Sequence, residues 1–159
     1  MITATLVTIP EPIVITSYSA PERKRRKLAA QHIRDQVSKD QLAPKINAVL
    51  QKYGVEGTIS LRRAAQYLGL TVTIRSGKLP LSESRAGGHF SVRPTFVSAD
   101  FTGECREFIT ELLAVMNDGN ELPADCIPEN AWDADIWSVQ VEIGTFRAPY
   151  KLIDYSAAD

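Results

Sequence analysis

The stretch Leu70-Thr71-Val72-Thr73-Ile74-Arg75 decides the fold, because its apolar and polar residues alternate with the two-residue period of a β-strand. Residues 59–62, which read Ile-Ser-Leu-Arg, have the same period, as do residues 137–143. The first two segments predict strands joined through Tyr67-Leu68-Gly69, and the third predicts a later strand. Residues 151–153 predict a last, short strand. We expect the longer strands to have one apolar and one polar face.

A helix over residues 102–119 is the clearest helical element of the chain. Thr102 can cap its start, Gly119 ends it, and its apolar residues recur at the spacing of one helical face. The apolar stripe consists of Cys105, Phe108, Ile109, Leu112, Val115 and Met116. The opposite face carries Glu104, Glu107, Glu111 and Asp118. The pattern predicts an amphipathic helix that packs one side against the core.

Two further helices are predicted before the strands. The first begins at Ser19-Ala20-Pro21-Glu22, which combines a capping serine, a proline tolerated in the first turn and a glutamate that can reach back, and it runs to Ser38. Its sparse apolar side consists of Leu28, Ile33 and Val37. In the second helix, Asp40 can cap the start and Gly54 stops the helix. The apolar face of this second helix consists of Ile46, Val49, Leu50 and Tyr53.

The remaining segments predict short strands and loops. Thr3 to Thr16 is rich in β-branched residues and is interrupted by two prolines, which predicts an edge strand. Residues 76–101 predict mostly loop, with one short strand near Phe96. The acidic residues of a later predicted loop are Asp125, Glu129, Asp133 and Asp135.

The composition is that of one ordinary domain, with 159 residues, 44% of them hydrophobic and 23% charged. We predict one α+β domain over residues 1–153, a small mixed or antiparallel sheet packed against two or three amphipathic helices, and a tail over residues 154–159. No apolar stretch approaches the roughly 20 residues that cross a bilayer, and a signal peptide is not expected. Cys105 and Cys126 are too few for a disulfide framework, so we expect a protein of the reducing cytoplasm.

Charge is distributed unevenly along the chain, although the net charge is only −1. Residues 1–95 hold fifteen basic and six acidic side chains, whereas residues 96–159 hold three basic and thirteen acidic ones. Three arrangements stay open. The two halves could compensate each other within one fold, they could pair with those of another subunit in a homodimer, or the acidic half could imitate nucleic acid.

The basic side chains are concentrated in one helical turn. Five successive helical positions, at about 100° each, sweep past a full circle, so this turn must project from the protein. Positive charge at a helix N-terminus also opposes the macrodipole, and an anionic partner would relieve this penalty. We predict that the turn binds such a partner, and a merely solubilising helix end is the alternative. The predicted contact residues are Arg23, Lys24, Arg25, Arg26 and Lys27, extended by Arg62, Arg63, Arg75 and Lys78 if their strands lie beside the helix.

Residues suited to catalysis or metal binding are few. His89 follows Gly87-Gly88 and is the histidine that could act as a base, with an exposed loop histidine as the simpler interpretation. His32 lies among the basic residues of the first helix. A metal site would have to gather its ligands from distant segments, namely His89, Cys105, Asp125 and Cys126. With no phosphate-binding glycine motif, the sequence predicts no enzyme, no metal and no cofactor.

Turn and cap motifs over roughly residues 42–153 resemble those of a group of small, uncharacterised α+β proteins encoded by phages and plasmids. The segments that carry the resemblance are Gly54–Arg62, Leu70–Gly77, Asp100–Gly103, Met116–Asn120 and Pro149–Leu152. The sequence departs from the group between Arg63 and Gly69, and the basic helix from Pro21 lies outside the match. The resemblance implies an origin in a mobile element and implies no activity.

A second resemblance concerns residues 63–80. Arg63-Ala64-Ala65-Gln66-Tyr67-Leu68-Gly69-Leu70-Thr71, followed by Ile74-Arg75-Ser76-Gly77-Lys78-Leu79-Pro80, is similar to the helix-turn-helix of excisionase and MerR-like DNA-binding proteins. Those proteins place a full recognition helix between the two segments, whereas here only Val72 and Thr73 intervene. Two residues cannot form that helix, so a strand is the preferred interpretation.

The segregated charge and the missing catalytic set favour a non-enzymatic interaction protein of a phage or mobile element. Its expected partner is a host protein or nucleoprotein, and one such role is inhibition of a host defence nuclease, as anti-CRISPR proteins do. The alternative is a nucleic-acid-binding or transcription-regulatory protein that uses the basic helix. An enzyme that uses His89 is the least supported hypothesis.

Overall fold

The structure is a computed structural model that describes residues 20–65, 67–82, 88–122 and 136–153. The chain divides into two compact units. Unit 1 comprises residues 1–36 and 119–136, and unit 2 comprises residues 37–118 and 137–159. In the described part of the chain, no helix is long and apolar enough to cross a membrane.

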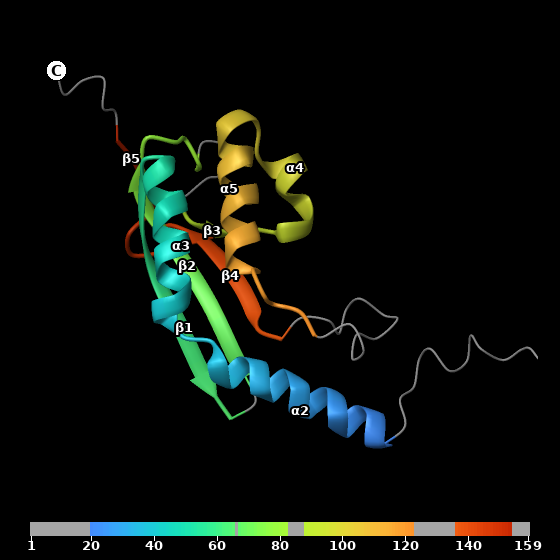
Figure 1. The fold of residues 1–159 in the computed structure, drawn as a ribbon. Helices are drawn as coiled ribbons and strands as arrows, with labels where there is room; N and C mark the ends of the chain where they lie inside the picture. The colour runs from blue at the N-terminus through green and yellow to red at the C-terminus, as the bar shows by residue number, and fades with distance from the viewer. Residues whose placement is uncertain (1–19, 66, 83–87, 123–135, 154–159) are drawn as a thin grey trace, which may run out of the picture. The chain divides into compact units, whose positions relative to one another are not determined.

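Unit 2 contains a five-stranded mixed sheet with the order β1-β2-β4-β3, and a short β5 also pairs with β2 (Figure 1). The strands are β1 (Val55–Ala64), β2 (Tyr67–Gly77), β3 (Phe90–Ser91), β4 (Ser138–Ile143) and β5 (Lys151–Leu152). β1 is antiparallel to β2, β3 is antiparallel to β4, and both β4 and β5 run parallel to β2. The predicted α+β class with a mixed sheet is confirmed, as are the strands predicted from alternation.

One face of this sheet is apolar. Residues paired across strands point to the same side of a sheet, and on this side apolar residues are paired with apolar residues. Leu70 pairs with Leu61 and Val139, and Val72 pairs with Ile59 and Val141. Leu70, Val72 and Ile74 of β2 have no exposed surface. The helices α3 (Lys39–Lys52) and α5 (Gly103–Met116) lie side by side over this face (Figure 1). The core therefore lies between the two helices and β2.

Helix α5 buries four of the six residues of the predicted stripe, Phe108, Ile109, Leu112 and Met116, and leaves Cys105 and Val115 half-buried. The Phe108 ring lies 5.3 Å from the ring of Tyr53 at the end of α3. Thr102 is the N-cap residue, as predicted, although its side chain makes no capping hydrogen bond. Trp137 donates its indole N–H to the Met116 carbonyl at 3.2 Å, which connects the end of α5 to the start of β4.

The cap of α3 differs from the prediction. Ser38 caps this helix, and Asp40 lies in its first turn. The Ser38 hydroxyl accepts a hydrogen bond from the Gln41 backbone N–H at 3.3 Å, while the Gln41 side chain accepts one from the Ser38 N–H. This reciprocal capping box satisfies two backbone donors that Asp40 alone would leave to water. At the other end, Gly54 leaves the helix with a φ of +66°, as the predicted stop requires.

Unit 1 contains α2 (Ala20–Gln36), which agrees with the predicted first helix. Its predicted apolar side is wrong at Leu28, which is 60% exposed. Arg34 donates to the Ile136 carbonyl at 3.2 Å, and the Asn120 side chain accepts a hydrogen bond from the Ile136 N–H at 2.8 Å. Polar contacts to the backbone therefore account for part of the packing of this unit.

The segment before α5 also differs from the prediction. No strand forms at Phe96; instead Pro94–Phe96 is a 3-10 turn that leads into the short helix α4 (Val97–Asp100), and the short strand lies earlier, at β3. Pro94 fixes a helical φ and has no N–H to donate, which favours a helix start over a strand. The predictions for residues 3–16, 125–135 and 154–159 lie outside the described residues, and the single-domain boundary stays a prediction.

We expect Ser38→Ala to lower the free energy of unfolding by about 1 kcal/mol, because it removes the N-cap of α3. Asp40→Ala should cost only about 0.3 kcal/mol through the helix dipole. Urea unfolding followed by circular dichroism measures both changes. Equal losses from the two variants would contradict the capping box.

Candidate functional site

The basic turn of α2, residues 23–27, is exposed to solvent in unit 1. The side chains of Arg23, Lys24, Arg25 and Lys27 are exposed, and Arg26 is half-buried. Lys27 lies three and four positions after Lys24 and Arg23, so these three cations share one side of the helix. Because α2 begins at Ala20, Arg23 lies in its first turn, where the macrodipole disfavours positive charge, and the other four residues lie in the second turn. The arrangement suits binding of an anion or an acidic surface.

The other predicted contact residues lie on the β1–β2 hairpin of unit 2 and form two separate pairs. Arg62 and Arg63 are near the hairpin turn, where Arg62 pairs with Gly69. Arg75 and Lys78 are near its opposite end, and the six residue steps from Gly69 to Arg75 span about 20 Å of strand. The structure therefore does not gather these four side chains into one patch.

Two of these hairpin residues have contacts within unit 2. The Arg63 guanidinium donates to the Val37 carbonyl at 2.7 Å, which attaches the hairpin to the segment that precedes α3. The methylene groups of Lys78 lie against Gly54, so that a Cβ at Gly54 would be 2.9 Å from the Lys78 Cε. Both residues have structural roles, and their predicted part in binding stays a prediction.

Ion pairs connect the basic and acidic halves of the sequence within unit 2. Lys45 pairs with Asp118, Lys52 with Glu111 at 3.0 Å, and Arg93 with Asp100 at 2.6 Å. Each pair joins a basic residue of positions 1–95 to an acidic residue of positions 96–159. Two of them connect α3 to α5 or to the residues just after it. Part of the acidic half is thus compensated inside the fold.

A cluster of Tyr53, Glu111 and Lys52 spans the contact between α3 and α5. The Tyr53 hydroxyl donates to the Glu111 carboxylate at 2.7 Å, and the Lys52 ammonium donates to both carboxylate oxygens at 3.0 Å. The Tyr53 hydrogen bond, followed by that of Lys52, lowers the pKa of Glu111 below its ordinary value. The same bonds to Glu111 raise the pKa of Tyr53 and of Lys52. The cluster keeps Glu111 charged and connects two core helices.

The polar face of the sheet carries an aromatic residue that the sequence interpretation assigned to a turn. Tyr67 lies across Gly69, because a Cβ at Gly69 would be 2.3 Å from the Tyr67 hydroxyl oxygen. This hydroxyl also lies 3.0 Å from the Ser138 Oγ on β4. The Tyr67 side chain is nevertheless 52% exposed. A half-exposed ring on a polar sheet face is a surface on which a planar group can stack.

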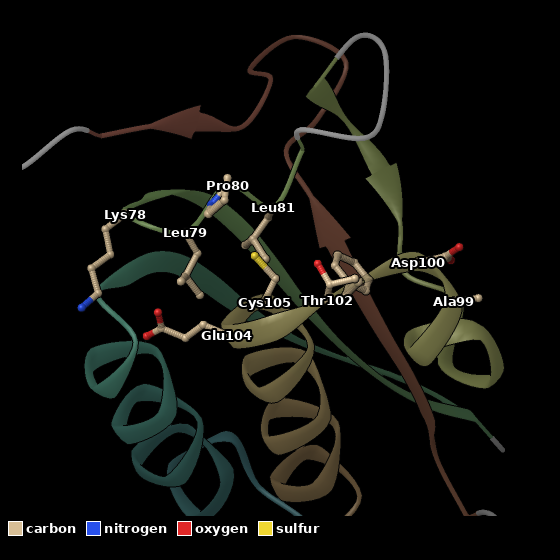
Figure 2. Close-up of a pocket in the computed structure, with 10 residues that line it drawn as sticks. Lys78, Leu79, Pro80, Leu81, Ala99, Asp100, Thr102, Glu104 and Cys105 are labelled. Carbon is tan, nitrogen blue, oxygen red and sulfur yellow. The ribbon is translucent and has the colours of Figure 1, made fainter.

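A cavity of about 610 Å³ lies between the segment after β2 and the start of α5 (Figure 2). Leu79, Leu81 and Phe101 form its buried apolar wall. Lys78 and Glu104 supply charged groups, and Cys105 points its sulfur towards Leu81. The volume is that of a small-ligand pocket.

Of the residues considered for catalysis or metal binding, the structure describes His32, His89 and Cys105. His89 is exposed, and its ring lies 5.8 Å from that of Phe146 in an edge contact. The His32 ring nitrogen lies 3.1 Å from the Gln36 amide in α2. In the described ranges, no three His, Cys, Asp or Glu residues cluster as metal ligands would. Asp125 and Cys126 lie outside those ranges.

No protein-family model, curated protein or solved structure matches the chain. The chemistry of the surfaces described above is therefore the basis for a functional proposal.

We expect Glu111→Gln to weaken the acid dependence of stability. Because the folded-state pKa of Glu111 is lowered, the ionised carboxylate stabilises the fold above the ordinary pKa of 4.5, and this contribution is lost as the pH falls through the lowered value. The urea midpoint of the variant should therefore fall less than that of the wild type between about pH 6 and about pH 3. Glu104→Gln, on the same helix, is the control and should keep the wild-type dependence. A wild-type dependence in Glu111→Gln would contradict the role of the cluster.

Proposed function

We propose that the protein is a non-enzymatic interaction protein that binds an anionic surface of a host macromolecule through the basic turn of α2. The observation that carries the proposal is the exposure of Arg23, Lys24, Arg25 and Lys27 within one helical turn. Like charges three and four positions apart, as in Arg23, Lys24 and Lys27, repel one another on the helix, and a negatively charged partner offsets this repulsion.

Part of the basic charge of unit 2 is used in ion pairs within that unit. Lys45, Lys52 and Arg93 of unit 2 are each engaged with a carboxylate of the same unit. These three side chains thus contribute to the fold of unit 2. The basic turn of unit 1 presents the exposed side chains of Arg23, Lys24, Arg25 and Lys27. Clustered exposed charge raises the rate at which an oppositely charged partner is captured.

The proposed biological setting is a phage or mobile element. It is supported by the resemblance of residues 42–153 to small proteins of phages and plasmids. In this setting the host macromolecule is a protein or nucleoprotein. A host defence nuclease is one such target, because its inhibition protects the mobile element. An acidic surface on such a nuclease complex, or its exposed phosphates, has the charge that the basic turn requires.

We expect the variant Arg23→Gln/Lys24→Gln/Lys27→Gln to reduce recovery of the partner from native-host lysate by about tenfold, because it removes three cations from one side of α2. The matched control, Lys39→Gln/Arg147→Gln/Lys151→Gln, removes three exposed cations elsewhere and should recover the partner as the wild type does. Quantitative mass spectrometry of the captured proteins measures the difference. Equal recovery by both variants would contradict the assignment of the surface.

Nucleic-acid binding is the second candidate function, and Tyr67 is the observation that favours it. Proteins that bind single strands combine cationic side chains with exposed aromatic rings on which bases stack. The polar sheet face offers the half-exposed Tyr67 ring, and Arg62 pairs with Gly69 beneath it. This function would be transcription-regulatory or would involve handling of single-stranded nucleic acid.

We expect nucleic-acid binding, if this is the function, to weaken with salt at a slope of log affinity against log salt near −4, as about four or five phosphate contacts require. Tyr67→Leu should lower the affinity for a single-stranded oligonucleotide by roughly tenfold, because a stacked base is lost. Tyr67→Phe keeps the ring and should retain most of the affinity. Fluorescence anisotropy measures all three proteins, and no binding at about 50 mM salt would exclude this candidate.

A further inference from the structure

In the described part of the chain, no strand pairs with the outer edge of β1. β1 is the end strand of the sheet, and among the described residues it pairs with β2 alone. It runs for ten residues, and its middle, Gly57-Thr58-Ile59-Ser60-Leu61, contains neither a charged residue nor a proline. Long edges without such residues are templates for pairing with another strand. The edge therefore suits addition of a strand.

A second copy of the same strand meets the geometric requirements of this edge. A two-fold axis perpendicular to the sheet joins two β1 strands in antiparallel fashion and keeps the helix-covered faces of both copies on one side. Directly opposed residues then belong to the same face of the sheet. The two-fold axis must therefore pass between one residue of β1 and the same residue of the second copy.

Charge selects one of these positions. With the axis at Ile59, Glu56 of one copy faces Arg62 of the second copy, and the same pair forms again on the other side of the axis. Both residues are exposed and lie on the polar face of the sheet. An axis at Thr58 or at Ser60 would place Glu56 opposite Ser60 or Ala64 and would lose both ion pairs. Opposite charges directly across an antiparallel pair stabilise it.

The helix-covered side of the edge is complementary in the same register. Ile59 and Leu61 are only half-buried within one chain. The axis at Ile59 brings the two Ile59 side chains together and places each Leu61 opposite Gly57 of the second copy. Gly57 has no side chain to obstruct Leu61. Position 57 lies beside a β-bulge and excludes a larger residue, because a Cβ there would be 2.5 Å from the Thr73 carbonyl oxygen. Pairing would thus remove apolar surface from water on one face and form ion pairs on the other.

We propose that the protein forms a two-fold homodimer in which the β1 strands pair antiparallel about Ile59, with reciprocal Glu56–Arg62 ion pairs. The two five-stranded sheets become one continuous sheet. This interface does not depend on the basic turn of α2, so it stands independently of the proposed function. It also assigns Arg62 to self-association.

Charge reversal tests the interface in the full-length chain. Glu56→Arg and Arg62→Glu each place like charges at both crossings, and each should weaken the dimer by about tenfold or more. A mixture of the two variants should restore dimers, because each crossing then joins an arginine to a glutamate, and the double variant should dimerise alone. Arg75→Glu makes the same charge change on β2 and should leave the dimer unaffected. Sedimentation equilibrium measures the dissociation constants, and circular dichroism verifies that each variant is folded.

A cross-link tests the register. Ile59→Cys places its thiol opposite its own counterpart, within the Cα separation that a disulfide spans, and should give a covalent dimer under mild oxidation. Leu61 is half-buried like Ile59, but a cysteine at position 61 would lie about 14 Å from its counterpart, so Leu61→Cys should cross-link no more than the wild type. A wild-type protein that is monomeric at about 100 µM, or a mixture of charge variants that fails to restore dimers, would overturn the proposal.

Discussion

Burial of Leu70, Val72 and Ile74 under α3 and α5 is the interaction on which the rest of the structure depends. Each of these side chains is withdrawn completely from water, which contributes roughly 1.5–3 kcal/mol apiece. Their strand, β2, is also the strand that pairs with β1, β4 and β5. Its position therefore fixes the hairpin with β1, both parallel partners and the two helices that cover the apolar face.

The elements with a local pattern could be predicted from the sequence. Alternation over residues 70–75 and the apolar stripe of residues 105–116 led directly to β2 and α5. Where the sequence interpretation was wrong, the deciding contact was not local or two local signals competed. Ser38 and Asp40 can both cap a helix, and the Gln41 side chain decides in favour of Ser38. The exposure of Leu28 depends on what packs against α2, which helical periodicity does not show.

The candidate surfaces were predictable to different degrees. The projection of the basic turn followed from helical geometry and charge, since five consecutive positions surround the helix and cations on every side are not all buried. Tyr67 was missed because its contact with Ser138 joins residues 71 positions apart in the sequence. The compensation of charge was left open for the same reason, because the pair between Lys52 and Glu111 depends on how α3 packs against α5. Features that depend on one helix or strand can thus be predicted from the sequence, whereas features that depend on contacts between elements cannot.

The parallel pairing of β2 with β4 has a consequence for the order in which the protein folds. Roughly sixty residues separate the end of β2 from the start of β4, so the central strand lacks one neighbour until a distant part of the chain has been synthesised. Until then, the nascent hairpin of β1 and β2 exposes two strand edges. Pairing over such a separation slows folding and leaves edges open to aggregation.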